Sequence, residues 1–210
     1  MKTKIAIIDF QLGNLFSVIQ ACNYFGYEPV ITSDPVEVAQ ADALILPGVG
    51  AFAEAMKNLN GNGLTDAIVE AVKKGKPLMG ICLGMQLLFE GSEEFSTEKG
   101  IGLLPGKIRK IPAENRRKIP QIGWNKIEPY SGEWDKTPLR SLQKGDFMYF
   151  VHSYYCEPAV EKDKLSLTEY DGFNYCSAVM RDNVFATQFH PEKSGPKGLS
   201  IYKNWLENIC

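Results

Sequence analysis

The first ninety residues alternate between short apolar runs and segments of helical periodicity. The apolar runs cover residues 4–9, 28–32, 42–50 and 76–81. Helical patterns occupy 15–26, a segment starting at Ser33-Asp34-Pro35, then 51–60, 64–74, and a further segment from Leu83 onward. Strands that alternate with helices pair in parallel through right-handed crossovers. We therefore expect an α/β fold built on an open, doubly wound, mostly parallel sheet.

Residues 100–190 have a different pattern, with short strand-like runs separated by turn residues. The runs are 101–111, 119–128, 147–155, 164–170, 176–182 and 183–189. They predict antiparallel strands in the second half. Residues 195–209 predict a closing amphipathic helix, whose apolar face carries Leu199, Tyr202, Trp205, Leu206 and Ile209. No long linker or repeat interrupts the chain, so we expect one domain over residues 1–210.

Charge and cysteine content exclude several classes of protein. The net charge is −2, which argues against broad binding to nucleic acid or anionic membranes. No apolar run approaches the roughly 20 residues of a membrane span, and the first run meets Asp9 too early for a signal peptide, so we expect a cytoplasmic protein. The five cysteines are odd in number and form no CxxC pair, which argues against a disulfide framework or a zinc site. We expect no metal and no cofactor.

Cys82 lies between two glycines in the stretch KPLMGICLGMQLLFEG, residues 76–91. A strand, a tight turn and a helix in this order are the geometry of a nucleophile elbow. The sulfur would then lie at the carboxyl end of the sheet, and the backbone N–H of Leu83 could hold an oxyanion. A lone cysteine is also commonly a small buried residue, so the motif by itself leaves both interpretations open.

A cysteine nucleophile needs a base, and the chain has only two histidines. His190 follows an apolar strand in the sequence HPE, and in an extended segment Glu192 would project from the same side. His152 lies among aromatic residues, where a packed histidine that also lines a pocket is the favoured interpretation. The segment PGVG, residues 47–50, ends another strand and can supply a second oxyanion donor, although a plain strand–helix turn has the same composition.

Two of these motifs together resemble the class I, triad-type glutamine amidotransferases. They are GICLGMQ at 80–86 and HPE at 190–192, more than a hundred residues apart. The segments PGVGAF, IGWN (122–125), YFVHSYY (149–155) and HPEKS (190–194) resemble in particular the glutaminase subunits of imidazole glycerol phosphate synthase, and the similarity runs over nearly the whole chain.

The resemblance implies a flavodoxin-like fold and hydrolysis of glutamine to glutamate and ammonia through a cysteine thioester. Cys82 would attack the side-chain amide, His190 would move the proton, and Glu192 would orient the imidazole. The implied oxyanion donors are the backbone N–H groups of Leu83 and of Gly48 and Val49. The implied glutamine-binding residues are Gly50, Gln86, Glu94, Ser153 and Tyr154.

The resemblance also implies a partner. Ammonia would pass to a separate (β/α)8-barrel synthase subunit, in a heterodimer that makes imidazole glycerol phosphate and AICAR in histidine biosynthesis. Residues implied to face that partner are Trp124, Asn125 and Lys193. A glutaminase of this kind would be weak until the partner holds its own substrate, and the PGVG segment would be the switch.

Some positions depart from the family pattern. Gln121 stands where members commonly have histidine, and Phe16 replaces a common basic residue, so the identity of the partner stays open. Three alternatives remain from the sequence. They are a related amidotransferase that supplies ammonia for amidation of a surface-polysaccharide sugar, a cysteine hydrolase of similar fold without a partner, and a non-catalytic flavodoxin-like binding module.

Overall fold

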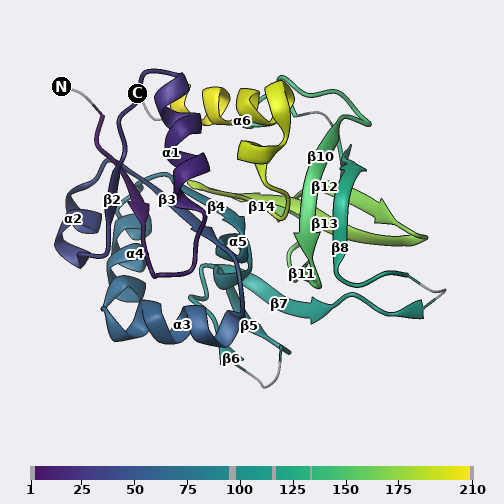
Figure 1. The fold of residues 1–210 in the computed structure, drawn as a ribbon, viewed down its shortest axis with the longest axis horizontal. Coiled ribbons are helices and arrows are strands. Elements are labelled where there is room, and N and C mark those ends of the chain that lie inside the picture. The colour runs from purple at the N-terminus through teal and green to yellow at the C-terminus, as the bar shows by residue number, and fades with distance from the viewer. Residues whose placement is uncertain (1–2, 95–97, 115–116, 133, 209–210) are drawn as a thin grey trace.

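The computed structural model describes residues 3–94, 98–114, 117–132 and 134–208. Within these residues, twelve strands form one mixed sheet whose main path runs β2-β1-β3-β4-β14-β13-β11-β7-β5-β6 (Figure 1). The first five strands of this path pair in parallel. They are β2 (Val30–Thr32), β1 (Ile5–Ile8), β3 (Ala43–Gly48), β4 (Leu78–Cys82) and β14 (Val184–Thr187). Their carboxyl ends therefore meet at one edge, where open α/β sheets bind ligands.

The second half of the sheet is largely antiparallel. Its strands on the main path are β13 (Phe173–Arg181), β11 (Tyr154–Pro158), β7 (Leu104–Lys110), β5 (Phe89–Ser92) and β6 (Glu98–Lys99). Strands β12 (Lys164–Tyr170) and β9 (Glu128–Pro129) branch from β13. A separate antiparallel pair, β8 (Gln121–Lys126) and β10 (Phe147–His152), crosses the end of this layer (Figure 1).

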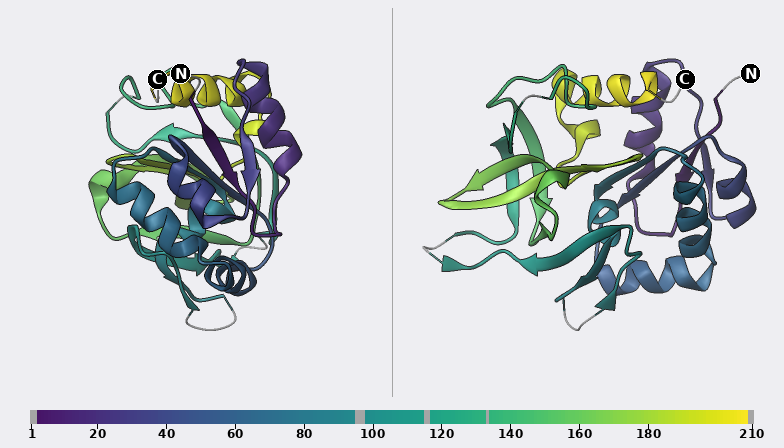
Figure 2. Two further views of the ribbon diagram at one scale, coloured as in Figure 1. Left: turned by 90° about the vertical axis from the view of Figure 1, so that its left-hand side faces the viewer. Right: turned by 180° about the vertical axis from the view of Figure 1, so that it is seen from behind.

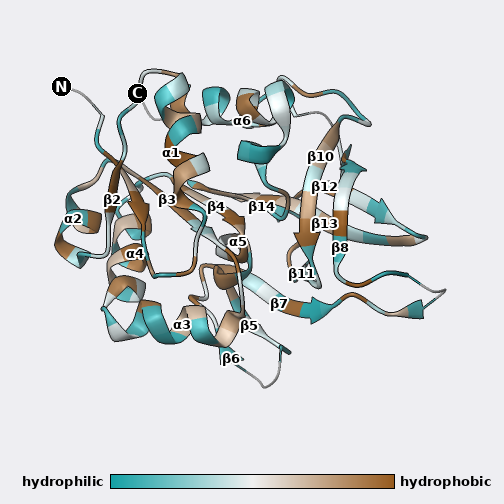
Figure 3. Ribbon diagram, in the orientation of Figure 1, coloured by the Kyte–Doolittle hydropathy of each residue, from teal (hydrophilic) through white to brown (hydrophobic). Residues whose placement is uncertain are grey.

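Helices cover both faces of the parallel strands, because alternate residues of each strand point to opposite sides. In β1, Ala6 and Ile8 pack with α2, α3, α4 and α5, while Ile5 and Ile7 pack with α1 and α6 (Figure 2). The central strands are accordingly apolar on both faces (Figure 3). The helices are α1 (Leu15–Tyr24), α2 (Pro35–Gln40), α3 (Phe52–Gly61), α4 (Leu64–Lys73), α5 (Leu83–Leu87) and α6 (Gly195–Glu207), with 3-10 turns η2 (Glu161–Asp163) and η3 (Pro191–Lys193).

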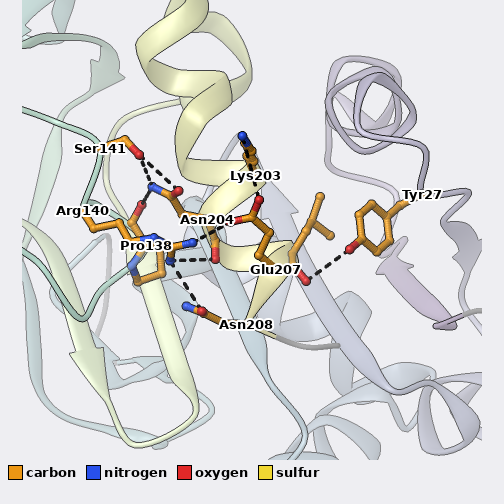
Figure 4. Close-up of polar contacts among 9 residues, drawn as sticks. Tyr27, Pro138, Arg140, Ser141, Lys203, Asn204, Glu207 and Asn208 are labelled. Atoms are coloured by element: carbon orange, nitrogen blue, oxygen red, sulfur yellow. Dashed lines mark hydrogen bonds and ion pairs between the residues drawn. The ribbon is translucent and has the colours of Figure 1, made fainter.

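Helix α6 is fixed to the loop before β10 by polar contacts (Figure 4). The buried Asn204 amide donates to the Pro138 carbonyl at 2.9 Å and to the Ser141 hydroxyl at 3.0 Å. Arg140 pairs with Glu207 at 2.7 Å. These contacts fix the C-terminal half of α6 to that loop, and the N-terminal end of α6 directly follows η3, which carries Glu192.

The predicted fold class is confirmed, with two local differences. The helix after Cys82 ends at Leu87, and Phe89 already belongs to β5, because the apolar run continues into the sheet instead of along a helix face. The single run 147–155 forms two strands of different sheets, interrupted at Ser153. Ile209 of the predicted final helix and Cys210 lie outside the described residues. No helix among the described residues is long and apolar enough to span a membrane.

Candidate active site

Cys82 is the last residue of β4 and immediately precedes helix α5. Its backbone has φ 56° and ψ −111°, a conformation that non-glycine residues rarely adopt and that is concentrated at functional sites. In the neighbouring strand β3, Gly48 lies opposite Cys82. The predicted elbow is therefore present, at the carboxyl ends of two central parallel strands.

Gly84 makes this elbow possible. A Cβ atom at this position would lie 1.7 Å from the backbone oxygen of Leu46 and 2.7 Å from its carbonyl carbon. Only a residue without a side chain lets α5 cross β3 this closely. The packing of α5 on the sheet thus requires glycine two residues after Cys82.

His190 and Glu192 come together just beyond the carboxyl end of β14, which is the neighbour of β4. The distance from His190 Nδ1 to Glu192 Oε1 is 2.7 Å, and the side chains are only 3% and 2% exposed. The pairing is confirmed, but the predicted reason for it is wrong. Residues Pro191–Lys193 form a 3-10 turn instead of an extended segment, and this turn brings the carboxylate to the imidazole.

Three hydrogen bonds, one between backbone groups and two made by the Ser194 hydroxyl, fix the position of this turn. The His190 N–H donates to the Tyr149 carbonyl at 2.9 Å. The Ser194 hydroxyl accepts from the Tyr149 N–H at 3.0 Å and donates to the His190 carbonyl at 2.6 Å. Strand β10 therefore holds His190 in position through Tyr149.

The environment of His190 favours the imidazolium form. Burial by itself lowers the pKa of His190, but the neighbouring Cys82 sulfur and then the Glu192 carboxylate outweigh burial and raise the pKa above its usual value. The other ring nitrogen, Nε2, is buried and has no hydrogen-bond partner by geometry among the described residues. One nitrogen of His190 is thus committed to Glu192, and the other is available for proton transfer with Cys82.

The remaining described cysteines are unsuited to nucleophilic chemistry. Burial raises the pKa of the Cys22 and Cys176 thiols to about 12 and that of Cys156 well above its usual value. All of these thiols are free, as is that of Cys82, which differs from them in lining a pocket. The structure thus singles out Cys82 from the rest.

A cavity of about 270 Å³ opens beside the Cys82 sulfur. It brings together residues from PGVG, from the elbow, and from the segment that joins β10 and β11. Its lining is Val49, Gly50, Cys82, Leu83, Gln86, Glu94, Pro120, Val151, His152, Ser153 and Tyr154. All five residues predicted to bind glutamine are in this lining. Among the described residues, no group of three or more histidine, cysteine, aspartate or glutamate side chains could hold a metal.

Gln86 and Glu94 already have partners inside the protein. The Gln86 amide nitrogen donates to the Tyr154 carbonyl at 3.0 Å and to Gln188 Oε1 at 2.9 Å, so its own oxygen remains for a ligand. Glu94 Oε2 accepts from the Phe52 N–H at 2.8 Å, at the start of α3. Both side chains are therefore held in place before any substrate binds.

One predicted oxyanion donor is directed elsewhere. The Val49 N–H donates to the Leu12 carbonyl at 3.1 Å, which corrects the expectation that this group faces the reacting centre in the observed conformation. The first N–H groups of a helix have no acceptor within that helix, so the Leu83 N–H at the start of α5 is consistent with the predicted role. Gly48 lies beside Cys82 but is absent from the cavity lining.

The residues predicted to face a partner lie outside the cavity. Trp124 is 55% exposed and its ring lies 6.1 Å from that of Tyr149, which in turn lies 6.4 Å from the His190 ring. Lys193 is exposed, and the Asn125 amide donates to the Glu169 carbonyl at 3.0 Å. Lys193 is thus the last residue of the turn that carries Glu192, and Tyr149 lies between Trp124 and His190, while Asn125 is bonded to β12.

Sequence reasoning missed Gln188, which is fully buried and has its amide nitrogen 3.8 Å from the Cys82 sulfur. Its position two residues before His190, in the predicted apolar run 183–189, is the signal that could have found it. For His152, the predicted packed and pocket-lining position is confirmed. Burial lowers the pKa of His152 to about 4, so this histidine is neutral at neutral pH.

Comparison with known proteins agrees with this geometry. The family described as "Glutamine amidotransferase class-I" matches residues 6–209. The chain belongs to this family. It is 47% identical over 206 residues to "Imidazole glycerol phosphate synthase subunit HisH" of Moorella thermoacetica, covering 98% of this chain and 95% of that one. It is 44% identical over 201 residues to the protein of the same name from Chlorobium luteolum, covering 96% and 98%.

Solved structures with low sequence identity share the fold of this glutamine amidotransferase. "Structure of PurLQS from Thermotoga maritima" matches with a TM-score of 0.75 at 19% identity, over 100% of both chains. "Crystal structure of glutamine amidotransferase" matches with a TM-score of 0.75 at 17% identity, over 97% of this chain and 98% of the other. The chain is thus an enzyme of the glutamine amidotransferase class, which excludes the non-catalytic binding module considered from the sequence.

Proposed function

We propose that this glutamine amidotransferase is the glutaminase subunit of an imidazole glycerol phosphate synthase. It hydrolyses glutamine and delivers the ammonia to a separate synthase subunit in histidine biosynthesis. One observation carries the chemical part. Cys82 lines the cavity and lies against His190, whose Nδ1 is 2.7 Å from Glu192 Oε1. The relatives named as subunits of that synthase, matched over nearly their full length, support the choice of acceptor.

In the proposed reaction Cys82 carries the glutamyl group, His190 moves the protons and Glu192 orients the imidazole. Cys82 first passes its proton to His190 Nε2, and the resulting thiolate, paired with the imidazolium, attacks the side-chain carbonyl carbon of glutamine. The same nitrogen then donates that proton to the departing ammonia, which leaves a glutamyl thioester. Water, deprotonated by His190, attacks the thioester carbonyl, and the proton returns to the Cys82 sulfur as glutamate departs. Glu192 holds Nδ1–H throughout and stabilises the imidazolium.

The glutamine substrate would occupy the cavity between PGVG and the segment 151–154. We propose that Gly50, Gln86, Glu94, Ser153 and Tyr154 bind it, as their places in the lining support. The Leu83 N–H supplies one oxyanion donor. The second, from the Gly48–Val49 segment, requires the Val49 N–H to leave the Leu12 carbonyl. One oxyanion donor contributes about 3 to 4 kcal/mol of transition-state stabilisation, so turning this one peptide would act as a switch.

The proposed partner is a (β/α)8-barrel synthase subunit, bound as a heterodimer through the face that includes Trp124, Asn125 and Lys193. Trp124 is exposed and its ring lies beside Tyr149, which is bonded to His190, and this supports the placement. Ammonia would cross that face, and the products would be imidazole glycerol phosphate and AICAR. Residues 1–210 would act as a single domain, and the cytoplasmic location stays a prediction.

The test of this proposal measures glutamate release by the chain alone and with a barrel-type synthase subunit and its ligand. We expect low basal release and an increase of a hundredfold or more with the liganded partner, since one oxyanion donor is then completed. Cys82→Ala is expected to release no glutamate in either state. Equal release with and without the partner would contradict the switch, and activity in the alanine variant would contradict the assigned nucleophile.

A second candidate acceptor is a related barrel-type partner that amidates a surface-polysaccharide sugar. Gln121, buried at the start of β8, is the observation behind it, because it stands where the synthase subunits commonly have histidine. Reconstitution with each type of partner separates the two acceptors. Ammonia-dependent formation of imidazole glycerol phosphate supports the first, and activation by only the sugar-modifying partner supports the second.

A further inference from the structure

A buried chain of side chains leads from the start of strand β8 to the nucleophile and is not used by the triad. It joins four strands, β8, β13, β10 and β11, and helix α5. Its members are Gln121 of β8, Tyr175 of β13, His152 of β10, the Tyr154 carbonyl of β11, Gln86 of α5, Gln188 and Cys82. Each named side chain in it is at most 7% exposed, apart from Tyr154, which takes part through its backbone.

The direction of the hydrogen bonds is fixed at His152. Its Nδ1 lies 2.8 Å from the Tyr154 carbonyl oxygen, which can only accept, so Nδ1 carries the proton. Because burial keeps the ring neutral, Nε2 is then an acceptor. The Tyr175 hydroxyl, 3.2 Å from Nε2, must therefore donate to it.

The next link follows from counting protons. Tyr175 has one hydroxyl proton, and burial keeps the phenol protonated by raising its pKa well above the usual value. With that proton on His152, the Gln121 amide 2.9 Å away must donate. As placed, its oxygen faces Tyr175 while its buried nitrogen has no partner, and turning the amide by 180° removes this conflict. With the phenol proton on His152, the Thr168 hydroxyl beside the same phenol can only donate to it, so it does not alter the count.

At its other end the chain holds the wall of the glutamine cavity. The Tyr154 carbonyl accepts from both His152 Nδ1 and Gln86 Nε2, at 2.8 and 3.0 Å. Gln86 also bonds Gln188, whose amide nitrogen is 3.8 Å from Cys82 Sγ. The segment 151–154 therefore depends on His152 for its position, and the same segment lines the cavity beside the sulfur.

We propose that Gln121 and Tyr175 are positioning residues for glutamine binding, which act by holding His152 in one tautomer and orientation against the Tyr154 carbonyl. Neither side chain lines the cavity, so both act through His152. The inference rests on the proposed glutamine site. It assigns to Gln121 the task of donating an N–H to Tyr175, and any side chain that donates from the same place can perform it.

The test compares three variants of the full chain. Gln121→Met keeps the length of the side chain and removes the donor. Tyr175→Phe removes only the hydroxyl. Gln121→His replaces the amide but keeps an N–H donor. Two reagents report on Cys82, and the labelled peptide is identified by mass spectrometry. Diazo-oxo-norleucine resembles glutamine and needs the cavity wall, whereas iodoacetamide needs only an accessible thiolate. The KM for glutamine and kcat are measured in parallel.

We expect Gln121→Met and Tyr175→Phe each to slow labelling by diazo-oxo-norleucine by about 3- to 10-fold and to raise KM by a similar factor, as for the loss of one buried hydrogen bond. Iodoacetamide labelling and kcat are expected to change by less than about twofold, which is smaller than the effect of losing one buried hydrogen bond. Gln121→His is expected to match the unmodified chain in the rate of labelling and in KM.

Unchanged KM and unchanged labelling by diazo-oxo-norleucine in both donor-removing variants would overturn the inference. An equal slowing of both reagents would also overturn it, because it would indicate general damage to the fold. If diazo-oxo-norleucine does not label Cys82 in the unmodified chain, the proposed glutamine site itself fails, and the inference fails with it. These results are distinguishable, since only the last concerns the unmodified protein.

Discussion

His152 provides a quantitative prediction of how stability depends on pH. Its native pKa is lowered to about 4 by burial, whereas an exposed histidine in the unfolded chain has a pKa of about 6.5. Between these values the unfolded state binds a proton that the native state does not. The contribution of His152 to stability is therefore fully present above the unfolded pKa and is lost as the pH falls toward the native pKa.

The size of the effect follows from the gap between the two pKa values. One unit corresponds to 1.36 kcal/mol, so the gap of about 2.5 units removes about 3 kcal/mol once the pH is below 4, and about 2 to 3 kcal/mol at pH 4.5. His190 has a raised pKa, so its contribution is present below the unfolded pKa and is lost only as the pH rises through the native value. The two histidines therefore act in different pH ranges.

The assay is guanidinium unfolding at pH 7.5 and 4.5, with His152→Asn as the matched variant. Asparagine keeps an N–H for the Tyr154 carbonyl but does not titrate. The unmodified chain is expected to lose about 2 to 3 kcal/mol more than the variant between the two pH values, because the other titrating groups are shared. An equal loss in both proteins would refute the assignment of His152 as a buried neutral imidazole.

Three further predictions concern the elbow and the triad. Gly84→Ala is expected to destabilise the fold by at least 1 to 3 kcal/mol, because the new Cβ overlaps backbone atoms, whereas the control Gly61→Ala has free space and should be neutral or slightly stabilising in thermal unfolding. Glu192→Gln is expected to lower kcat by about 100- to 10,000-fold with little change in KM, since it weakens the 2.7 Å hold on His190, and a kcat within threefold of the unmodified value would be contrary to that role. Brief iodoacetamide treatment, followed by peptide mapping, is expected to modify Cys82 before any other described cysteine, because the other thiols are buried. Faster modification of another described cysteine would contradict this.

The proximity of Cys82, His190 and Glu192 was predictable because these residues follow simple rules of position. Parallel strands place Cys82 and His190 at the same edge of the sheet, and the spacing of His190 and Glu192 allows contact whether the backbone is extended or turned. The actual 3-10 turn was not predictable, because it depends on the bonds that Ser194 makes to β10. Local pattern thus identified the residues but not the backbone that holds them.

Other features of the site depend on contacts that no local pattern encodes. The Val49 N–H is bonded to Leu12 from a different loop, so its direction could not be read from PGVG. The contact of Tyr175 with His152 depends on how β10 crosses the antiparallel strands, and the run 147–155 gave no sign that it divides between two sheets. Gln188 was missed although it lies two residues before His190, because burial of its polar side chain is visible only in the folded protein.

The central claim is that Cys82 carries the glutamyl group during turnover. The most direct measurement is acid quenching of the enzyme during steady-state turnover of glutamine, followed by mass analysis of its peptides. The account predicts one glutamyl group on the peptide that contains Cys82, removable by hydroxylamine and absent from Cys82→Ala. A glutamyl group on a different residue, or glutamate formation at the normal rate by Cys82→Ala, would contradict it.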